Sequence, residues 1–503
     1  MKIALVNSPP WALNAPPLNL GYLTSYLRQN GHEVYPFDFN IETYVKSSSH
    51  HKYLWERDLD GDWIKNNSTF IYNEIEIWVQ RVLRTKAQII GISLYNDSKY
   101  ICIQFAKAIK KKDPSKIIIF GGPQCSRGFL SEELLRERVV DVFVIGEGEE
   151  TLLNLLDIYE RDKKITYCKG TILRKNNSLM DCGDRILIKD LDRIPFPDYS
   201  NLPLQYYIQH EEISILGSRG CFAKCVFCQD FLNAGDYRFR SAENIFKEMC
   251  LRYDSGYTSF FFNDLTSNGN LHQLNELCDL IINSRLYRHI EITSEMRCRQ
   301  EMTLSLYKKL YKGGWRIILY GAESGSQAIL NKMNKGYNVH VIDKNIRDTY
   351  LAGIKAEVNL IVGFPGETEH TFKETLNLLK RNHKYIYNIS ALYQLDLREG
   401  SPIAINYRKY GIIKGDEYKC WHTSDCKNNY PWRLKLIYEV IKYANALNIK
   451  LGFDDTHFYF YHALTYYHKL KKDYKNSYEI MLETLEYLSA KIKKLEGKLR
   501  DIK

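Results

Sequence analysis

Short apolar runs alternate with helical patterns from residue 1 to about residue 160. Each run is rich in isoleucine, valine and phenylalanine and is about as long as a buried parallel strand. Between two of the runs, the spacing of Leu20, Leu23 and Leu27 predicts a helix, and Asn30-Gly31 is a favourable helix end. Strands that alternate with helices predict a doubly wound, Rossmann-like α/β sheet. The predicted strands are Lys2–Val6, Ile89–Ser93, Lys116–Phe120 and Asp141–Ile145.

A second alternation of strand and helix is repeated about six times between residues 209 and 400. The spacing of Phe372, Leu376 and Leu379 is typical of its helices. This succession predicts a partial (β/α)6 barrel of the TIM type, and the chemistry of such barrels lies at the carboxyl ends of the strands. The predicted strands are Ile213–Leu216, Ser259–Asn263, Ile290–Thr293, Arg316–Tyr320, Lys355–Val362 and Ile386–Tyr393.

A proline-rich segment separates the two alternations. Pro195 and Pro197 lie within Asp190–Tyr199 and exclude a helix there, so the segment is expected to be extended. A chain of 503 residues is also expected to form two or three domains. We therefore predict a doubly wound domain over 1–165, a linker over 166–208, a partial barrel over 209–400 and a mostly helical carboxyl-terminal region over 401–503.

The carboxyl-terminal region contains three sequence patterns that lead to less specific predictions. Cys420–Cys426 contains two cysteines and one histidine at irregular spacing, which fits pocket lining or packing better than a second metal site. The aromatic stretch Phe458–Tyr461 is expected to pack against the barrel. A stripe at spacings of three and four predicts a helix that docks on its own domain or forms a dimer seam. Its residues are Leu485, Leu488, Ile492, Leu495 and Leu499.

Composition narrows the class of protein. The chain is 45% hydrophobic and 13% aromatic, which is typical of a globular protein and excludes a disordered one. No apolar run is long enough to cross a membrane, so we expect no membrane span. Pro9-Pro10 interrupts the amino terminus too early for a signal peptide, which predicts a cytoplasmic protein. Twelve cysteines in such a protein indicate metal or redox chemistry and buried thiols, not disulfides.

The net charge of +10 is spread along the chain, and Lys110-Lys111-Lys112 is one of its densest basic stretches. A solvated surface explains this charge. A basic surface also favours an anionic substrate or nucleic acid, but no nucleic-acid-binding motif accompanies it. We therefore expect no nucleic-acid partner.

Three cysteines in a CxxxCxxC pattern are the strongest chemical signal: Cys221, Cys225 and Cys228. They follow the first predicted barrel strand, so they belong to the active mouth of the barrel. Thiolates are soft ligands that favour iron–sulfur clusters or zinc. Three ligands on a four-iron cluster leave one iron open to a substrate or cofactor. The alternatives are a zinc knuckle with a distant fourth ligand and three unrelated buried thiols.

At these cysteines the chain resembles the radical S-adenosylmethionine (radical SAM) superfamily, in which an aromatic residue, here Phe227, precedes the last cysteine. The resemblance implies a [4Fe-4S] cluster on Cys221, Cys225 and Cys228, which are then the catalytic cluster ligands. It also implies that the amino and carboxylate groups of SAM chelate the fourth iron. The reduced cluster cleaves SAM to a deoxyadenosyl radical that abstracts hydrogen.

The other strand ends of the predicted barrel supply candidate contacts to SAM. By resemblance, Asn263 and Asp264 lie at the SAM amino group, and a cation beside Glu295, namely Arg297, pairs with the carboxylate. Capping or barrel-rim roles are the alternative for these polar residues. Two further segments resemble those that contact the ribose and methionine and the adenine of SAM. They are Gly321–Ser326, with Glu323 and Ser324, and Ile361–Thr368, in which Thr368 can also cap a helix.

The first predicted sheet resembles the cobalamin-binding domain of class B radical SAM enzymes. Glycines at its strand ends let the backbone approach a bulky ligand, although plain turns are the alternative for each loop. The first loop, Asn7 to Leu20, lacks the histidine of the DxHxxG motif. The resemblance therefore implies cobalamin with a detached nucleotide tail and no histidine below the metal. The candidate contacts are Ser93, Leu94, Tyr95, Asn96, Gly121, Gly122, Pro123, Gly146, Glu147 and Gly148.

The resemblance implies a cobalamin-dependent radical SAM methyltransferase. In this reaction the deoxyadenosyl radical removes hydrogen from an unactivated carbon, which then takes a methyl group from methylcobalamin. The alternatives are a family member that catalyses a cyclisation or rearrangement without methylation, and a zinc-stabilised α/β binding protein without catalysis. A methylthiotransferase is disfavoured because the amino-terminal domain lacks a second set of three spaced cysteines. The expected partners are a peptide or small-molecule substrate and an external electron donor such as flavodoxin or ferredoxin.

Overall fold

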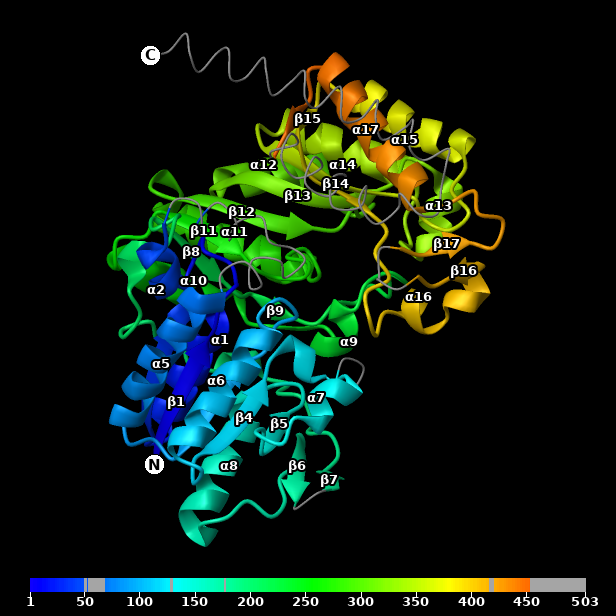
Figure 1. Cartoon of the computed structure of the whole chain (residues 1–503). Helices are drawn as coiled ribbons and strands as arrows, with labels where there is room; N and C mark the ends of the chain where they lie inside the picture. The colour runs from blue at the N-terminus through cyan, green and yellow to red at the C-terminus, as the bar shows by residue number, and fades with distance from the viewer. Residues whose placement is uncertain (49–51, 53–67, 127–129, 176–177, 416–419, 453–503) are drawn as a thin grey trace, which may run out of the picture. The chain divides into compact units, whose positions relative to one another are not determined.

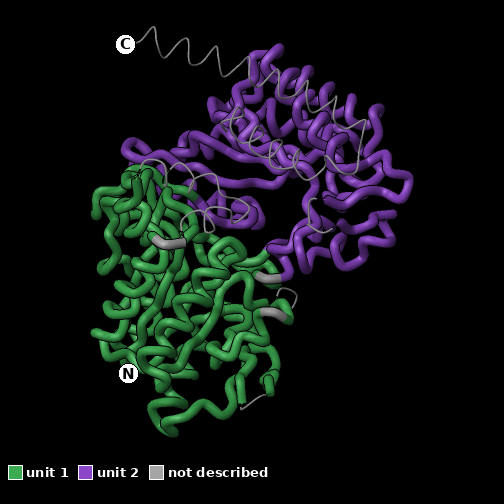
Figure 2. Tube along the Cα trace, viewed as in Figure 1, with its two compact units in different colours: residues 1–220, 233–261 green, residues 221–232, 262–503 purple. Residues whose placement is uncertain are grey.

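The computed structural model of the chain describes residues 1–48, 52, 68–126, 130–175, 178–415 and 420–452 (Figure 1). The chain forms two compact units, shown in two colours in Figure 2. Unit 1 comprises residues 1–220 and 233–261, and unit 2 comprises residues 221–232 and 262–503. The three cysteines of the CxxxCxxC pattern belong to unit 2. The domain boundaries given above stay a prediction.

Unit 1 contains the predicted doubly wound sheet. Its seven strands have the order β2-β1-β3-β4-β5-β6-β7, and β2, β1, β3, β4 and β5 are parallel neighbours (Figure 1). The antiparallel strands β6 and β7 extend the sheet at one edge. The strands are β1 (Lys2–Asn7), β2 (Glu33–Asp38), β3 (Ile89–Ser93), β4 (Ile117–Gly121), β5 (Val142–Val144), β6 (Thr171–Lys175) and β7 (Ser178–Asp181).

Helices give this sheet its hydrophobic core. Every residue of β3 is buried, as expected for a strand that is covered on both faces. In the same buried cluster, the ring of Phe39 stacks on the ring of Trp78, and the two ring centroids are 5.0 Å apart. The helices between these strands are α1 (Leu18–Gln29), α2 (Phe39–Lys46), α5 (Ser68–Arg84), α6 (Lys99–Lys112), α7 (Glu132–Arg136) and α8 (Glu149–Asp162).

Three strands of unit 1 were not predicted from the sequence. Strand β2 has half-buried positions and contains Pro36, which is tolerated because β2 is an edge strand. Residues 171–181 fell within the predicted linker but form β6 and β7. The rest of that segment has short 3₁₀ turns at Leu191–Arg193 and Leu204–Tyr206.

The second sheet confirms the partial barrel. Its order is β18-β15-β14-β13-β12-β11-β8, and the pairs from β12 to β15 and β18 are parallel. The succession of the strands in space follows their succession in the chain from β8 to β15, as in a (β/α) barrel. The strands are β8 (Glu212–Ile215), β11 (Ser259–Phe262), β12 (Glu291–Met296), β13 (Trp315–Glu323), β14 (Lys355–Val362), β15 (Ile386–Gln394) and β18 (Lys450–Leu451).

Helices alternate with these strands as the sequence predicted. Thr368 forms a capping box with Thr371 at the start of α15, which confirms its predicted capping role. The helices are α9 (Asp230–Ala234), α10 (Ala242–Asp254), α11 (Leu271–Ser284), α12 (Leu304–Lys312), α13 (Gln327–Met333), α14 (Val339–Leu351), α15 (Glu369–Asn382), α16 (Pro402–Ile405) and α17 (Tyr430–Ala446). Two small hairpins pair β9 (Ser218–Arg219) with β10 (Arg238–Phe239) and β16 (Ile412–Ile413) with β17 (His422–Thr423).

The described residues settle some expectations for the rest of the chain. Among the described residues, none of the twelve cysteines forms a disulfide. None of the described helices is both long and apolar enough to cross a membrane. The predicted leucine stripe from Leu485 to Leu499 and the aromatic stretch Phe458–Tyr461 lie outside the described residues.

The stacked core of unit 1 leads to a stability prediction. Trp78→Ala removes a fully buried side chain, so we expect it to lower the free energy of unfolding by about 3–5 kcal/mol. Urea unfolding followed by circular dichroism measures this loss. Ile77→Ala is the matched control, since this neighbour is 44% exposed and its loss is expected to cost less than about 1 kcal/mol. Equal losses in the two variants would contradict the assigned packing.

Candidate functional site

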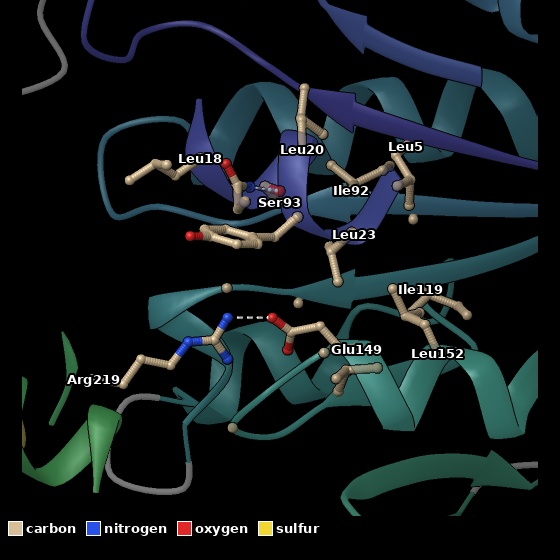
Figure 3. Close-up of a pocket in the computed structure, with 18 of the residues that line it drawn as sticks. Leu5, Leu18, Leu20, Leu23, Ile92, Ser93, Ile119, Glu149, Leu152 and Arg219 are labelled. Carbon is tan, nitrogen blue, oxygen red and sulfur yellow. Dashed lines mark hydrogen bonds and ion pairs between the residues drawn. The ribbon is translucent and has the colours of Figure 1, made fainter. Parts of the chain in front are cut away.

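Unit 1 has a cavity of about 330 Å³ at the carboxyl ends of its parallel strands (Figure 3). Doubly wound sheets bind their ligands at this edge. Most of the lining is apolar and comes from β1, α1, β3, β4 and α8. The lining residues are Leu5, Leu18, Asn19, Leu20, Tyr22, Leu23, Gly91, Ile92, Ser93, Ile119, Gly121, Gly122, Val144, Gly146, Gly148, Glu149, Leu152, Leu216 and Arg219.

Half of the residues predicted to contact cobalamin line this cavity. They are Ser93, Gly121, Gly122, Gly146 and Gly148. The other five, Leu94, Tyr95, Asn96, Pro123 and Glu147, do not line it. Among these five, the Leu94 amide donates to the carbonyl of the lining residue Gly121 over 2.7 Å, and the Tyr95 ring stacks on Trp11.

Helix α1 supplies lining residues that sequence reasoning missed. The spacing of Leu20 and Leu23 was used only to predict a helix, and both side chains line the cavity (Figure 3). Asn19 lies beside them and donates from Nδ2 to the Ser93 hydroxyl over 2.6 Å. The three-and-four spacing predicted the helix correctly, but spacing cannot distinguish a core face from a cavity face.

A network of buried charges closes one side of the cavity. The Arg219 guanidinium lies 2.5 Å from the Glu149 carboxylate, as Figure 3 shows, and 2.9 Å from Glu147. Arg238 adds a second cation at 2.8 Å from the same Glu147 oxygen. Each buried charge therefore has an opposite charge in contact, which offsets the cost of its desolvation.

The electrostatics of this network favour its ionised form. Burial acts to raise the pKa of Glu149, but the charge of Arg219 and its hydrogen bond outweigh this effect and leave the pKa lowered. Burial likewise acts to lower the pKa of Arg219, and Glu149 and Glu147 reverse it, so that the pKa is raised. Arg219 comes two residues before Cys221, so the network fixes the chain just ahead of the cysteine loop.

The glycines at the cavity suit a large ligand. Gly146 has φ +78°, a conformation that favours glycine, and a Cβ added there would meet no atom within 4 Å. Such a Cβ would project into open space beside the cavity, so the glycine leaves that space to a ligand. The glycine loops and the leucine-rich lining together fit a large, partly apolar molecule.

The cysteine loop of unit 2 is partly buried. Cys225 is buried, whereas Cys221 and Cys228 are half-buried, and each of these two interacts electrostatically with Cys225. Burial raises the pKa of the Cys221 thiol, and burial followed by the charge of Asp230 raises the pKa of Cys228 to about 12. Metal binding to these thiols therefore has to release protons.

Two backbone contacts position this loop within unit 2. The Val226 amide donates to the Met333 carbonyl over 3.0 Å, and the Asn334 side chain donates to the Lys224 carbonyl over 2.8 Å. Within the described ranges of the chain, no three His, Cys, Asp or Glu side chains form a group that could hold a single metal ion. At 420–426, the Cys426 sulfur lies 3.7 Å from Nδ1 of His422.

Arg297 lies directly beside the cysteines. Its guanidinium Nη1 is 3.6 Å from the Cys225 sulfur, and its plane lies over the rings of Tyr337 and Phe222. Asn268, buried in the loop after β11, accepts from the Arg297 amide and donates to the Arg297 carbonyl. Among the described residues, the structure thus brings Arg297, but not its neighbour Glu295, into hydrogen-bonding contact with the cysteine loop. Sequence reasoning missed Asn268, which has no motif of its own.

Glu323 forms a buried ion pair at the end of β13. Its carboxylate lies 3.0 Å from the Lys335 ammonium, and its backbone has φ +62°. Burial acts to lower the pKa of Lys335, but the charge of Glu323 leaves it raised. Lys335 also lies over the ring of Phe227, the aromatic residue of the cysteine pattern. Lys335 was missed because a single lysine after a short helix carries no sequence signal.

The remaining predicted SAM contacts differ in their surroundings. Asp264 is buried and Asn263 is exposed at the end of β11. Desolvation is the largest cause that raises the pKa of the Glu295 carboxyl. The negative charges of Glu323 and Asp230 raise it further. The Ser324 hydroxyl is buried. It forms a hydrogen bond with the Thr375 hydroxyl and accepts one from the Ser326 amide, which gives this side chain a structural role.

The segment after β14 forms a tight turn. Gly363 has φ +77°, and its amide donates to the carboxylate of the buried residue Glu367. Burial raises the pKa of Glu367 to about 8, although hydrogen bonds from the Gly363 and Phe364 amides act against this rise. The Glu367 side chain therefore stabilises the backbone of the turn to which it belongs.

Comparison with known protein families agrees with both sites. Residues 11–156 match the B12 binding domain, and residues 215–379 match the radical SAM superfamily. The chain is a cobalamin-binding radical SAM protein. The first match covers the glycine-lined cavity, and the second covers the cysteine loop and the ends of β11 to β14.

Relatives of this cobalamin-binding radical SAM protein carry the names of different reactions. An uncharacterized methyltransferase of Pyrococcus horikoshii is 26% identical over 82% of this chain and 87% of its own length. An anaerobic magnesium-protoporphyrin IX monomethyl ester cyclase of Cereibacter sphaeroides is 25% identical over 83% of this chain and 69% of its own.

Two solved structures share the fold. The radical SAM methyltransferase TsrM of Kitasatospora setae, with tryptophan and a SAM analogue bound, has a TM-score of 0.64 at 17% identity, over 82% of this chain and 77% of its own. OxsB, with aqua-cobalamin and SAM bound, has a TM-score of 0.62 at 18% identity, over 81% of this chain and 56% of its own. At this identity the similarity concerns the fold alone.

The cofactors of this protein follow from its two domains. The radical SAM domain implies a [4Fe-4S] cluster and SAM, and the B12-binding domain implies cobalamin. The residues present fit both groups. Three thiols in one loop supply soft ligands for iron, and glycine-lined open space at the strand ends suits a macrocycle.

The Glu149–Arg219 pair leads to a prediction about stability and pH. We expect Glu149→Gln to lower the free energy of unfolding by about 2 kcal/mol at neutral pH, because it removes one charge of a buried pair. The pKa of Glu149 is lowered by folding from its usual 4.5, so the stabilisation by the pair is complete well above pH 4.5 and is lost progressively as the pH falls from there through the lowered pKa. The difference between wild type and variant should therefore narrow on acidification.

Urea midpoints from pH 7 down to about pH 2.5 measure this difference, because the narrowing takes place below the usual pKa of a glutamate. Glu150→Gln is the matched control, because this neighbouring carboxylate is 43% exposed and lies 3.9 Å from Arg185. An exposed pair of this kind contributes less than about 1 kcal/mol. A pH-independent difference for Glu149→Gln would contradict the assigned ion pair.

Proposed function

We propose that this protein is a cobalamin-dependent radical SAM methyltransferase that methylates an unactivated carbon. The observation that carries the proposal is the presence, in one chain, of a glycine-lined cavity at the ends of parallel strands and a three-cysteine loop within a radical SAM domain. The methyltransferase name of the P. horikoshii relative supports it. The substrate is expected to be a peptide or a small molecule.

When bound, the cluster and SAM supply a radical that removes hydrogen, and cobalamin supplies a methyl group. The protein binds and orients these groups and excludes water from them. Cys221, Cys225 and Cys228 would hold the cluster. Arg297 lies at Cys225, so it is placed to pair with an anionic group bound beside that cysteine, such as the carboxylate of SAM.

Several other residues of unit 2 are proposed to complete the SAM site. Asp264 at the end of β11 would accept from the SAM amino group, with Asn263 beside it. Glu323, paired with Lys335, would contact the ribose hydroxyls. Glu295 at the end of β12 and the backbone of Ser324 would line the same site. Phe227, beneath the Lys335 ammonium, would shield the cluster from water.

Unit 1 is proposed to bind cobalamin through its cavity and the loops around it. The leucines and isoleucines along α1, β1 and β4 favour a flat apolar group, such as a detached nucleotide base, over a charged one. No histidine occurs between Asn7 and Leu20, so this loop offers no imidazole to cobalt. The loops at residues 93–96, 121–123 and 146–148 would contact the corrin ring.

A second candidate function is a radical cyclisation or rearrangement without methyl transfer. The specific observation in its favour is the cyclase name of the relative from C. sphaeroides, which is as similar to this chain as the methyltransferase. A methylthiotransferase, the name of a relative from Methanocaldococcus jannaschii, is less well supported. In unit 1 the described cysteines are Cys102, Cys125, Cys168, Cys182 and Cys250, and no three of them form a metal site.

Labelled SAM tests the proposed reaction. The reduced protein, loaded with cluster and cobalamin, is incubated anaerobically with SAM that carries ¹³C in its methyl group and with candidate peptides and small molecules. Methyl label in a product, found by mass spectrometry together with 5′-deoxyadenosine, is the expected result. Formation of 5′-deoxyadenosine and of a product without label would overturn methylation in favour of the cyclisation.

Iron analysis tests the cluster itself. Purified without oxygen, the wild-type chain should contain about four iron and four sulfide, as a [4Fe-4S] cluster requires. Cys225→Ala should lose most of the iron and the ultraviolet–visible absorption of the cluster, because one of three protein ligands is gone. Cys250→Ala, on helix α10, is the control and should retain both. A colourless protein with zinc in place of iron would refute the proposal.

An external electron donor is expected to reduce the cluster. Flavodoxin and ferredoxin are the proposed donors, and comparison of turnover with each measures the preference.

A further inference from the structure

A buried arginine lies in the core of unit 2, close to the turn at Gly363. Arg433, in the first turns of α17, is completely buried. Its guanidinium stacks 3.9 Å from the centre of the Trp421 ring and donates to the Trp421 carbonyl over 3.0 Å. It also donates to the Gln394 side chain at the end of β15. Such a charge is costly to bury, and these hydrogen bonds and the stacking on Trp421 offset part of that cost.

Asn428 connects this arginine to the turn. Its Oδ1 accepts from Arg433 Nη1 over 3.0 Å. Its Nδ2 donates to the carbonyl of Gly363 over 2.9 Å and to that of Phe364 over 3.3 Å. One side chain thus holds two consecutive carbonyls of the turn while its own orientation is determined by Arg433.

The aliphatic part of Arg433 packs directly on the turn. A Cβ added to Gly363 would come within 2.2 Å of Cδ and 2.3 Å of Cγ of Arg433. The positive φ of Gly363 also disfavours any other residue. The shape of the turn and the position of the arginine are therefore mutually dependent.

We propose that Asn428 and Arg433 are positioning residues for the turn Gly363–Phe364, and that they set its backbone for SAM. This inference rests on the proposed function and on the resemblance of Ile361–Thr368, which contains this turn, to the segment that contacts the adenine of SAM. Neither residue is proposed to touch SAM. They act from the carboxyl-terminal region, whose role the sequence alone did not reveal.

Residues of the carboxyl-terminal region also pack against the cysteine loop. Trp421, Ile403 and Phe364 belong to one buried cluster, against which Val226 and Phe227 pack. The Ile403 amide donates to the Val226 carbonyl over 2.9 Å. Because apolar packing holds the cysteine loop and hydrogen bonds from Asn428 hold the turn, a change at Asn428 should disturb the turn selectively.

Asn428→Asp separates these effects. The new carboxylate keeps the acceptor for Arg433 but replaces the donor to the two carbonyls with an acceptor, which they repel. We expect the dissociation constant for SAM to rise about tenfold, which corresponds to the loss of two hydrogen bonds of modest strength. Iron content and the electron paramagnetic resonance spectrum of the reduced cluster without SAM should stay as in wild type. Equilibrium dialysis with labelled SAM measures the affinity.

Asn429→Asp is the matched control. It makes the same amide-to-carboxylate change one residue away, where the side chain caps α17 by accepting from the Trp432 amide and does not contact the turn. Aspartate caps helices as well as asparagine does, so this variant should bind SAM like wild type. If Asn428→Asp does not fold, Asn428→Ser, which introduces no charge, replaces it in the same assays.

The outcomes distinguish this inference from the proposed function. A selective loss of SAM affinity in the Asn428 variant, with full iron content, supports the positioning role. Unchanged affinity overturns it, and so does a parallel fall in SAM affinity, iron content and melting temperature, since that result indicates general destabilisation. A wild-type protein that holds four iron but binds no SAM would overturn the proposed function, and this inference with it.

Discussion

Parallel pairing of backbone strands is the constraint on which both candidate sites depend. In a parallel sheet all strands end at the same edge, so the residues that follow them meet there although they are far apart in the sequence. This places Ser93, Gly121 and Gly146 around one cavity. It also gathers Arg297, Glu323 and Gly363 at the ends of β12, β13 and β14.

Buried charge is the second constraint, and the chain meets it by close pairing. Arg219 contacts Glu149 and Glu147, and Lys335 contacts Glu323. In a low-dielectric interior an ion without a partner costs several kcal/mol, so each pair fixes the position of both partners. The consequence is that residues next to the candidate cofactor sites are oriented by other protein groups before any ligand binds, which lowers the entropic cost of binding.

The two sites differ in how their walls are made. The cavity of unit 1 is lined mainly by leucine, isoleucine and glycine, with the charged network at one side. The surroundings of Cys225 are polar and aromatic: Arg297 and Lys335 each lie over the ring of Tyr337. The first favours a large and partly apolar group, and the second favours an anionic group at a metal centre. This difference matches the cofactors of a cobalamin-binding radical SAM protein.

Local patterns were sufficient to predict the architecture. Hydrophobic patterns predicted β3 and β14 with their exact ends: β3 is buried along its whole length, and in β14 the buried apolar residues Ala356, Val358, Leu360 and Val362 occupy alternate positions. They failed at β2, whose half-buried positions and Pro36 lack that pattern, and at β6 and β7, whose pairing depends on the edge of a sheet formed elsewhere. The capping role of Thr368 was predicted because capping depends only on the residues that follow.

The sequence by itself determined the chemistry of the chain: three thiols in one loop, glycines at strand ends and the order of two α/β alternations. Only the tertiary structure decided which side chains support that chemistry. Leu23 and Asn19 line a cavity, and Lys335 forms an ion pair with Glu323. Asn428 and Arg433, which belong to a region without a motif, hold the Gly363 turn. The reason is physical: a ligand set needs particular residue types at close spacing, whereas packing and charge pairing only need groups that meet in space, at any separation along the chain.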